Sequence, residues 1–155
     1  MNEVTCPECG AVFAPKATVK PRSYPQLKRY FAVIKAAFHH WPESHQFRPK
    51  NADHLRYWLE VEAGHFEAAK SIRCESVEPQ ILTALLTAVM RTSDDDRQFV
   101  DVDGQLITVK RALSISYPML AHLATCKLFE DVDNVIKQEL GIEPDELLRQ
   151  TEAAA

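Results

Sequence analysis

The chain has 155 residues, of which 46% are hydrophobic and 26% are charged, a balance typical of one globular domain with a buried core. No apolar run approaches the roughly 20 residues that cross a bilayer, and four glycines are too few for a loop-rich all-β fold. The charge is uneven, because residues 1–50 carry eight Lys/Arg against three Asp/Glu, a net of +5, whereas residues 51–155 carry a net of −9.

The first ten residues lack the charged start and apolar run of a secretory signal, so we expect a cytoplasmic protein with no membrane association. In a reducing compartment, cysteines are typically metal ligands or free thiols rather than disulfide partners. The chain has four of them: Cys6, Cys9, Cys74 and Cys126.

Two parts are predicted, a short basic leader over residues 1–22 and a globular domain over residues 23–155. The leader holds the motif Cys6-Pro-Glu-Cys9-Gly and a brief strand at residues 12–13. The first helix is predicted to start near Ser23, a good N-cap residue, and to end before Pro42. Apolar residues recur every three or four positions and predict one buried face. They are Leu27, Tyr30, Phe31, Ile34, Ala37, Phe38 and Trp41.

The remaining elements also follow from periodicity and turn signals. Asp103-Gly104 predicts the turn of a β-hairpin, and Gly141 ends a long helix that opens at Pro118. In chain order we expect a helix at 52–63, an extended segment at 65–74, a helix at 79–91, a hairpin at 99–109, a strand at 113–116, the long helix, and a short helix at 144–151. The predicted fold class is α+β: a helix-dominated single domain with a small β-hairpin or sheet and an N-terminal Cys-x-x-Cys knuckle.

The motif at Cys6 and Cys9 is the sharpest chemical signal. Two thiolates two residues apart bind one zinc ion through a tight turn, and the following glycine lets the backbone wrap the metal. One such pair supplies half of a tetrahedral site, so we predict a structural zinc with its other ligands left open. The candidates are His39, His40, His45, His65, Cys74, Cys126 or the same cysteine pair of a second subunit. The alternative is a cysteine pair that binds no metal.

Positive charge is concentrated where acidic residues are missing, between Cys9 and Glu43. Phosphates are bound by cations spaced along a surface, and aromatic rings among them can stack on bases. We therefore predict DNA, single- or double-stranded, as the partner. The predicted contacts are Lys16, Lys20, Arg22, Tyr24, Lys28, Arg29 and Lys35. The alternatives are a solvated helix face and a surface for a protein partner.

Two polar groups suggest enzymatic chemistry, but each has a simpler explanation. His40 and Glu43 can support proton transfer, yet histidines also suit the C-terminal end of a helix. The carboxylates of residues 94–96, Asp101 and Asp103 can hold Mg²⁺, but turn chemistry explains them equally well. We therefore predict a non-enzymatic protein and keep a metal-dependent nuclease as the least favoured alternative.

Two stretches resemble a group of phage and prophage proteins of unknown function. Residues 20–32, Lys-Pro-Arg-Ser-Tyr-Pro-Gln-Leu-Lys-Arg-Tyr-Phe-Ala, resemble the start of the group's first helix. Residues 54–67 resemble its second helix, with the following Ala-Gly-His-Phe-Glu, and residues 113–116 match a later segment more loosely. The group is itself loosely similar to the NinB/Orf recombination proteins, which bind DNA. The knuckle at Cys6 and the segment 79–91 depart from the group's pattern.

This resemblance implies a phage or prophage DNA-binding accessory protein, acting in recombination or replication in the host-cell cytoplasm. The long helix that follows Pro118 would then complete the core or a homodimer interface. The alternative is a protein-interaction adaptor or decoy that uses the acidic two thirds of the chain.

Overall fold

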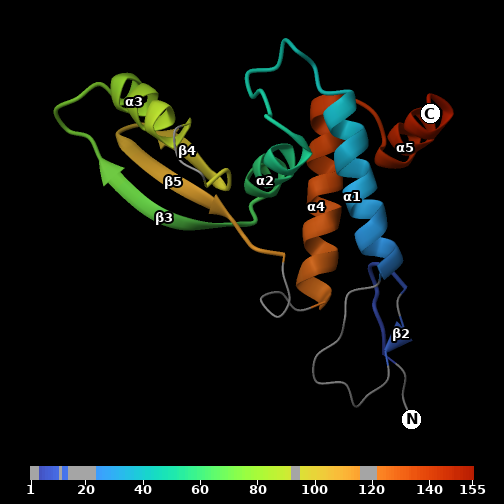
Figure 1. Cartoon of the computed structure of the whole chain (residues 1–155). Coiled ribbons are helices and arrows are strands. Elements are labelled where there is room, and N and C mark those ends of the chain that lie inside the picture. The colour runs from blue at the N-terminus through green and yellow to red at the C-terminus, as the bar shows by residue number, and fades with distance from the viewer. Residues whose placement is uncertain (1–3, 11, 14–23, 92–94, 116–121) are drawn as a thin grey trace.

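The computed structural model describes residues 4–10, 12–13, 24–91, 95–115 and 122–155. Within these residues, helices and short antiparallel strands form the helix-dominated α+β fold that the sequence predicts (Figure 1). The elements are β1 (Val4–Thr5), β2 (Val12–Phe13), α1 (Tyr24–His39), α2 (Ala52–Glu62), β3 (Phe66–Arg73), α3 (Pro79–Arg91), β4 (Gln98–Asp103), β5 (Leu106–Ala112), α4 (His122–Leu140) and α5 (Pro144–Ala153). None of the described helices is long and apolar enough to cross a membrane.

Helices α1, α2, α4 and α5 pack together as a bundle, in which α1 lies beside α4 (Figure 1). The predicted buried face of α1 is confirmed at Tyr30, Ile34 and Ala37, and the ring of Tyr30 stacks on Phe129 of α4 with centroids 4.1 Å apart. The core of the bundle consists of Tyr30, Val33, Ile34, Ala36, Ala37, Leu55, Leu59, Ile115, Leu128, Phe129, Val132, Ile136 and Leu147.

Local signals set several helix ends. Pro25 lies in the first turn of α1, where a missing N–H costs little, whereas the predicted cap at Ser23 lies outside the described residues. Asn51 caps α2, because its side chain accepts a hydrogen bond of 2.8 Å from the backbone N–H of His54. The predicted start of the long helix at Pro118 also lies outside the described residues, and α4 is described from His122.

The second part, here called the sheet layer, is the antiparallel sheet β3-β5-β4 with α3 packed against β4 and β5. The predicted hairpin is confirmed, with Asp103 paired to Leu106 and Gly104 at a φ of 57°. The strand predicted at 113–116 is wrong for residues 113–115, which follow β5 without strand structure. Here the chain leaves the sheet for the bundle, where Ile115 joins the core instead of pairing with a strand.

One feature of the bundle gave no sequence signal, a buried ionic network between α1 and α2. The carboxylate of Glu60 is fully buried and accepts hydrogen bonds from Tyr30 Oη at 2.8 Å and Arg56 Nη1 at 3.0 Å. Burial raises the pKa of Glu60, although its two partners act in the opposite direction. Charged residues on a helix usually face solvent, so the sequence of α2 gives no reason to expect that Glu60 is buried.

Candidate metal centre

The N-terminal motif folds as a tight hairpin knuckle. Strands β1 and β2 pair antiparallel, with Thr5 opposite Val12, and the turn between them carries both cysteines. The N–H of Gly10 donates to the carbonyl of Cys6 at 2.9 Å, and Gly10 has a φ of 70°. A residue with a Cβ is strained at this φ, so glycine is the residue that closes the turn at low cost. The local sequence therefore brings Cys6 and Cys9 onto one side of a turn.

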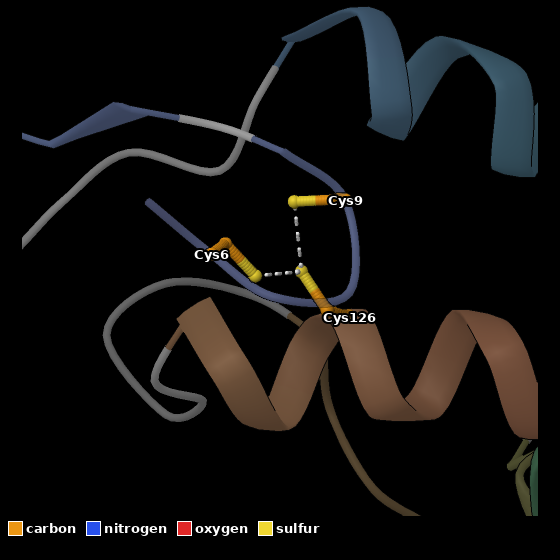
Figure 2. Close-up of side chains that lie close together, drawn as sticks. All are labelled: Cys6, Cys9 and Cys126. Atoms are coloured by element: carbon orange, nitrogen blue, oxygen red, sulfur yellow. Dashed lines mark hydrogen bonds between the residues drawn. The ribbon is translucent and has the colours of Figure 1, made fainter. Parts of the chain in front are cut away.

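The third cysteine comes from the other end of the chain. Cys126 lies in α4, and its Sγ is 3.8 Å from Sγ of Cys6 and 3.5 Å from Sγ of Cys9 (Figure 2). All three sulfurs lie within 4.8 Å of one another, and Cys6 and Cys126 are buried. These three residues form the only group of at least three His, Cys, Asp or Glu side chains close enough to share a metal ion among the described residues.

These spacings fit zinc. A tetrahedral zinc ion binds sulfur at about 2.3 Å, which places pairs of ligand sulfurs about 3.8 Å apart. The sulfur separations of 3.5 Å and 3.8 Å are close to this value. Three thiolates are also the soft ligands that zinc accepts and that Mg²⁺ and Ca²⁺ do not favour. Cys6, Cys9 and Cys126 can therefore hold a metal ion together.

The protonation of the three thiols differs. Burial alone would raise the pKa of Cys6, but hydrogen bonds from the backbone amides of Cys9 and Glu8 and from the neighbouring thiols lower it. Burial and the two nearby cysteines raise the pKa of Cys126 to about 12, although the Gln26 amide donates to its sulfur at 3.5 Å. Negative charge on one sulfur therefore opposes charge on the next, and a divalent cation at the centre would relieve that repulsion.

The structure brings one of the candidate ligand partners close to the cysteine pair of the knuckle. Cys126 joins the pair at Cys6 and Cys9, whereas the other candidates belong to no such group in the described chain. His39 and His40 are exposed at the end of α1. His45 approaches Glu139 at 3.0 Å, His65 approaches Asp131 at 2.8 Å, and Cys74 is buried at the end of β3.

The predicted DNA contacts are only partly described. Lys16, Lys20 and Arg22 lie outside the described residues, as does the side chain of Tyr24 at the start of α1. Lys28 and Lys35 are exposed on α1.

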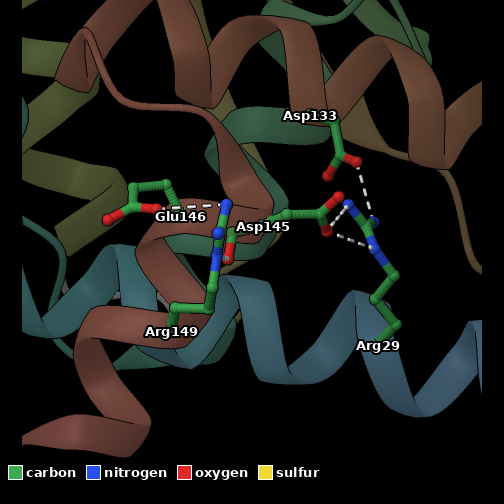
Figure 3. Close-up of polar contacts among 5 residues, drawn as sticks. All are labelled: Arg29, Asp133, Asp145, Glu146 and Arg149. Atoms are coloured by element: carbon green, nitrogen blue, oxygen red, sulfur yellow. Dashed lines mark hydrogen bonds and ion pairs between the residues drawn. The ribbon is translucent and has the colours of Figure 1, made fainter.

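Arg29, one of the predicted DNA contacts, already forms ion pairs within the bundle, which disfavours its predicted role without excluding it. Its guanidinium bridges Asp133 of α4 at 2.8 Å and Asp145 of α5 at 2.9 Å (Figure 3). Partial burial alone would lower the pKa of Arg29, but the two carboxylates outweigh it and raise the pKa. The same figure shows the surface pair Arg149–Glu146 within α5, at 3.1 Å. Arg29 is thus committed to joining three helices.

The carboxylates proposed for a nuclease are also paired individually. Asp95 contacts Arg111 at 3.2 Å, Asp96 contacts Lys50 at 2.6 Å, and Asp101 contacts Lys110 at 2.5 Å. Asp103 is exposed at the hairpin turn, and Asp94 lies outside the described residues. These pairs neutralise the carboxylates separately and disfavour a shared magnesium site.

Two clefts lie next to the candidate residues described above. A cleft of about 940 Å³ opens between β4, α2 and the segment before α2, and the stacked rings of Phe47 and Trp58 line it. The other, of about 730 Å³, is bordered by Cys9, Cys126 and Arg29. Among the described residues, the three cysteines that could share a metal ion lie at the smaller of these two clefts.

No family model, curated protein or solved structure matches this chain. The resemblance to phage and prophage proteins therefore stays a prediction.

Proposed function

We propose that Cys6, Cys9 and Cys126 hold one structural zinc ion, and that the ion docks a basic, DNA-binding N-terminal region onto the helical bundle. The observation that carries the proposal is the meeting of Cys9 and Cys126 across 117 positions of the chain, with their sulfurs at ligand spacing.

A metal ion has a clear physical task here. Strands β1 and β2 have two residues each, and an isolated hairpin of that size is unstable in water. Thiolate bonds to zinc supply folding free energy directly, which is why many small zinc modules unfold without metal. The ion would therefore both order the knuckle and fasten it to α4.

Docking the knuckle also organises the basic segment. Phe13 ends β2 and Tyr24 begins α1, so the segment that contains Lys16, Lys20 and Arg22 connects the knuckle to the bundle along the chain. Lys28 and Lys35 continue the charge along α1, and their spacing of seven residues places them on one side of the helix. These lysines and Arg22 would contact the DNA phosphates. Arg29 is not included, because it forms ion pairs with Asp133 and Asp145. A phage-type accessory role in recombination or replication is the setting that the resemblance suggests.

The experiment measures zinc content by elemental analysis and DNA affinity across a salt series. Zinc-loaded protein is expected to hold one zinc per chain and to bind single-stranded or duplex DNA with an affinity that falls steeply with salt. The double variant Lys28→Glu/Lys35→Glu should weaken binding and lower the salt slope by about 2 on duplex DNA. The control is Lys70→Glu on β3, which should leave the slope unchanged. Zinc-loaded protein that binds neither form of DNA at low salt contradicts the DNA-binding function, and metal-free protein contradicts the zinc site.

The exposed face of α3 favours a second function, protein interaction. Val77, Ile81, Leu85 and Val89 repeat every four residues and expose 47%, 54%, 57% and 65% of their surface. No charged residue lies between Pro79 and Met90, so this face neither repels a second copy of itself nor offers charge to a different partner. Ridges with a spacing of four residues pack against each other at about −50°. The occupant we propose is α3 of a second copy of this chain.

Molar mass in solution tests the α3 interface. The native chain should be a dimer at micromolar concentration, and Leu85→Lys should make it a monomer without loss of helical signal. Val102→Lys, on an exposed apolar position of β4, is the matched control and should stay dimeric. A native chain that is monomeric at high micromolar concentration contradicts this second function.

A further inference from the structure

The larger cleft, of about 940 Å³, takes no part in the proposed zinc site. It lies between α2, β4 and the segment that precedes α2, and pockets that bind small ligands typically have volumes of about 300–1,000 Å³. Such pockets combine aromatic or apolar walls with a few polar groups that orient the ligand. The walls and charges of this cleft therefore indicate which kind of ligand fits it.

The walls of the cleft are aromatic. The ring of Phe47, before α2, stacks on Trp58 of α2 with centroids 4.9 Å apart and an angle of 8° between the planes. His54 of α2 stacks on Phe99 of β4, at 5.7 Å and 13°. All four side chains line the cleft and are only partly buried. Such walls favour a flat ring as the ligand, because flat rings stack on aromatic side chains.

Most of the charged groups that line the cleft are paired within the chain. Asp95 pairs with Arg111 at 3.2 Å. Lys50 pairs with Asp96 at 2.6 Å, and the second lysine of the cleft pairs with Asp101 at 2.5 Å. These groups neutralise one another, so they offer little charge to a ligand.

The remaining acidic and basic side chains of the described lining are Glu62 and Arg48, and neither forms an ion pair with a described residue. Arg48 directly follows Phe47 in the chain. Glu62 lies four residues after Trp58, so these two share one face of α2. The two opposite charges therefore border the same pair of stacked rings. A matching ligand is flat, donates hydrogen bonds to a carboxylate and carries negative charge for a guanidinium.

The carboxylate of Glu62 is poorly stabilised by its own surroundings. Partial burial raises the pKa of Glu62, and Asp101 and Glu139 act in the same direction against Lys110. Donors from a ligand would stabilise the charged form. An ionised carboxylate has two oxygens that only accept hydrogen bonds. Among the nucleic-acid bases, guanine presents two adjacent donors to such a group, N1–H and N2–H.

We propose that this cleft binds a guanine nucleotide, with the base against the aromatic walls, its N–H donors on Glu62 and its phosphate on Arg48. The nucleotide can be free or part of a single strand of nucleic acid, because both sources present the same base and phosphate. The site uses neither the cysteines nor the lysines of α1, so it goes beyond the proposed function and does not depend on it.

Calorimetric titration with GMP, AMP, guanosine and inorganic phosphate tests the site. The native chain should bind GMP at least about 10-fold more tightly than AMP, because the adenine edge places an acceptor nitrogen next to its one donor group. Guanosine, which lacks the phosphate, should bind more weakly than GMP, and inorganic phosphate alone should not bind measurably. Equal affinity for GMP and AMP overturns the proposal.

Variants assign the roles of the residues. Glu62→Gln should weaken GMP binding at least about 10-fold, and Phe99→Leu about 5-fold or more. Arg48→Gln should weaken GMP binding about 5-fold or more but leave guanosine binding unchanged, which a merely structural effect would not do. The matched controls are Glu67→Gln and Arg73→Gln, at exposed positions of β3 outside the cleft, and both should bind like the native chain. Far-UV circular dichroism checks that each variant keeps its fold.

A ten-nucleotide thymine strand with one central guanine, compared with an all-thymine strand, distinguishes the two sources. A strand that binds more tightly than GMP, and only with its guanine, identifies single-stranded nucleic acid, whereas tighter binding of GMP identifies the free nucleotide. Lys28→Glu/Lys35→Glu should keep GMP binding, so failure of the proposed DNA contacts is distinguishable from failure of this site. Native chain that binds neither GMP nor the guanine strand preferentially, or unchanged affinity in Glu62→Gln, overturns the proposal.

Discussion

The helical bundle and the sheet layer bury their apolar side chains to very different extents. In the bundle, Leu55, Leu59, Leu128, Val132 and Ile136 are completely buried between helices. In the sheet layer, the outer side of α3 and parts of the hairpin are open to solvent. Among the described residues, all the exposed large apolar side chains except Leu123 belong to this layer: Val77, Ile81, Leu85, Val89, Val102 and Leu106.

The difference follows from the number of layers. In the bundle, each of the four helices finds neighbours on its apolar side, and α5 closes the far side of α1 (Figure 1). In the sheet layer, α3 packs against β4 and β5, and its outer face is exposed at Ile81, Leu85 and Val89. The bundle therefore buries most of the apolar surface that stabilises the fold, whereas the sheet layer exposes apolar side chains.

The largest expected effect is on the buried ionic network of the bundle. Glu60→Ala leaves Arg56 buried without its carboxylate and Tyr30 without an acceptor, so the free energy of unfolding should fall by about 3–5 kcal/mol. Urea unfolding measures the loss. Glu62→Ala, two positions along α2 at an exposed site, is the control and should change stability by at most about 0.5 kcal/mol. An equal decrease in the free energy of unfolding for the two variants would show that the buried network does not stabilise the bundle.

The same substitution, leucine to alanine, tests the difference in burial between the two regions when it is made once in each region. Leu59→Ala in the bundle creates a cavity at a fully buried site and should cost about 2–5 kcal/mol of unfolding free energy. Leu85→Ala on α3 removes a side chain that is 57% exposed and should cost less than about 0.5 kcal/mol in the monomer. Dilute protein and urea titration keep any self-association out of the measurement. A large loss for Leu85→Ala would mean that α3 is covered in solution.

Zinc removal should also separate the two regions. With free zinc at about 100 times its dissociation constant, metal binding stabilises the native state by about 2.7 kcal/mol, and a chelator removes that contribution. Because the ligands lie on the knuckle and α4, hydrogen exchange should accelerate in β1, β2 and the first turns of α4. The amides of β3 and β5 serve as the internal reference and should change little. Acceleration spread evenly over both regions would contradict a local anchoring role.

The smallest effect concerns the junction between the two regions, where His65 precedes β3 and contacts Asp131 of α4 at 2.8 Å. Partial burial would raise the pKa of Asp131, but the hydrogen bonds from His65 and Lys127 outweigh it and lower the pKa. A carboxylate with a lowered pKa stabilises the fold fully above its ordinary value of about 3.9, and this contribution disappears as pH falls through the lower folded value.

Asp131→Asn should therefore cost less than about 1 kcal/mol near neutral pH and flatten the acid side of the stability curve. Unfolding by urea between acidic and neutral pH measures both quantities. Asp145→Asn, which touches the bundle but not the junction, should leave the His65 contribution in place. An unchanged acid limb in Asp131→Asn would show that the junction contact contributes nothing.

Most of the secondary structure could be predicted, because its causes are local. The 3–4 spacing of apolar residues predicts α1 and α2, and Asp103-Gly104 predicts the hairpin of β4 and β5. The strand predicted at 113–116 failed at Leu113–Ile115 for a reason outside that segment, since Ile115 gains more from the bundle core than from strand pairing. The burial of Glu60 could likewise not be predicted from the sequence, because the spacing of apolar residues does not show which charged residue faces a partner helix.

The amino-acid sequence by itself determined the Cys6–Cys9 turn, the periodicity of the helices and the concentration of positive charge before Glu43. Only the tertiary structure decided that Cys126 completes the cysteine group and that Arg29 is neutralised by Asp133 and Asp145. The physical reason is the range of the interactions. Turn geometry and helical faces depend on neighbours within a few residues, whereas a meeting between residues more than 100 positions apart depends on how α1, α4 and α5 pack.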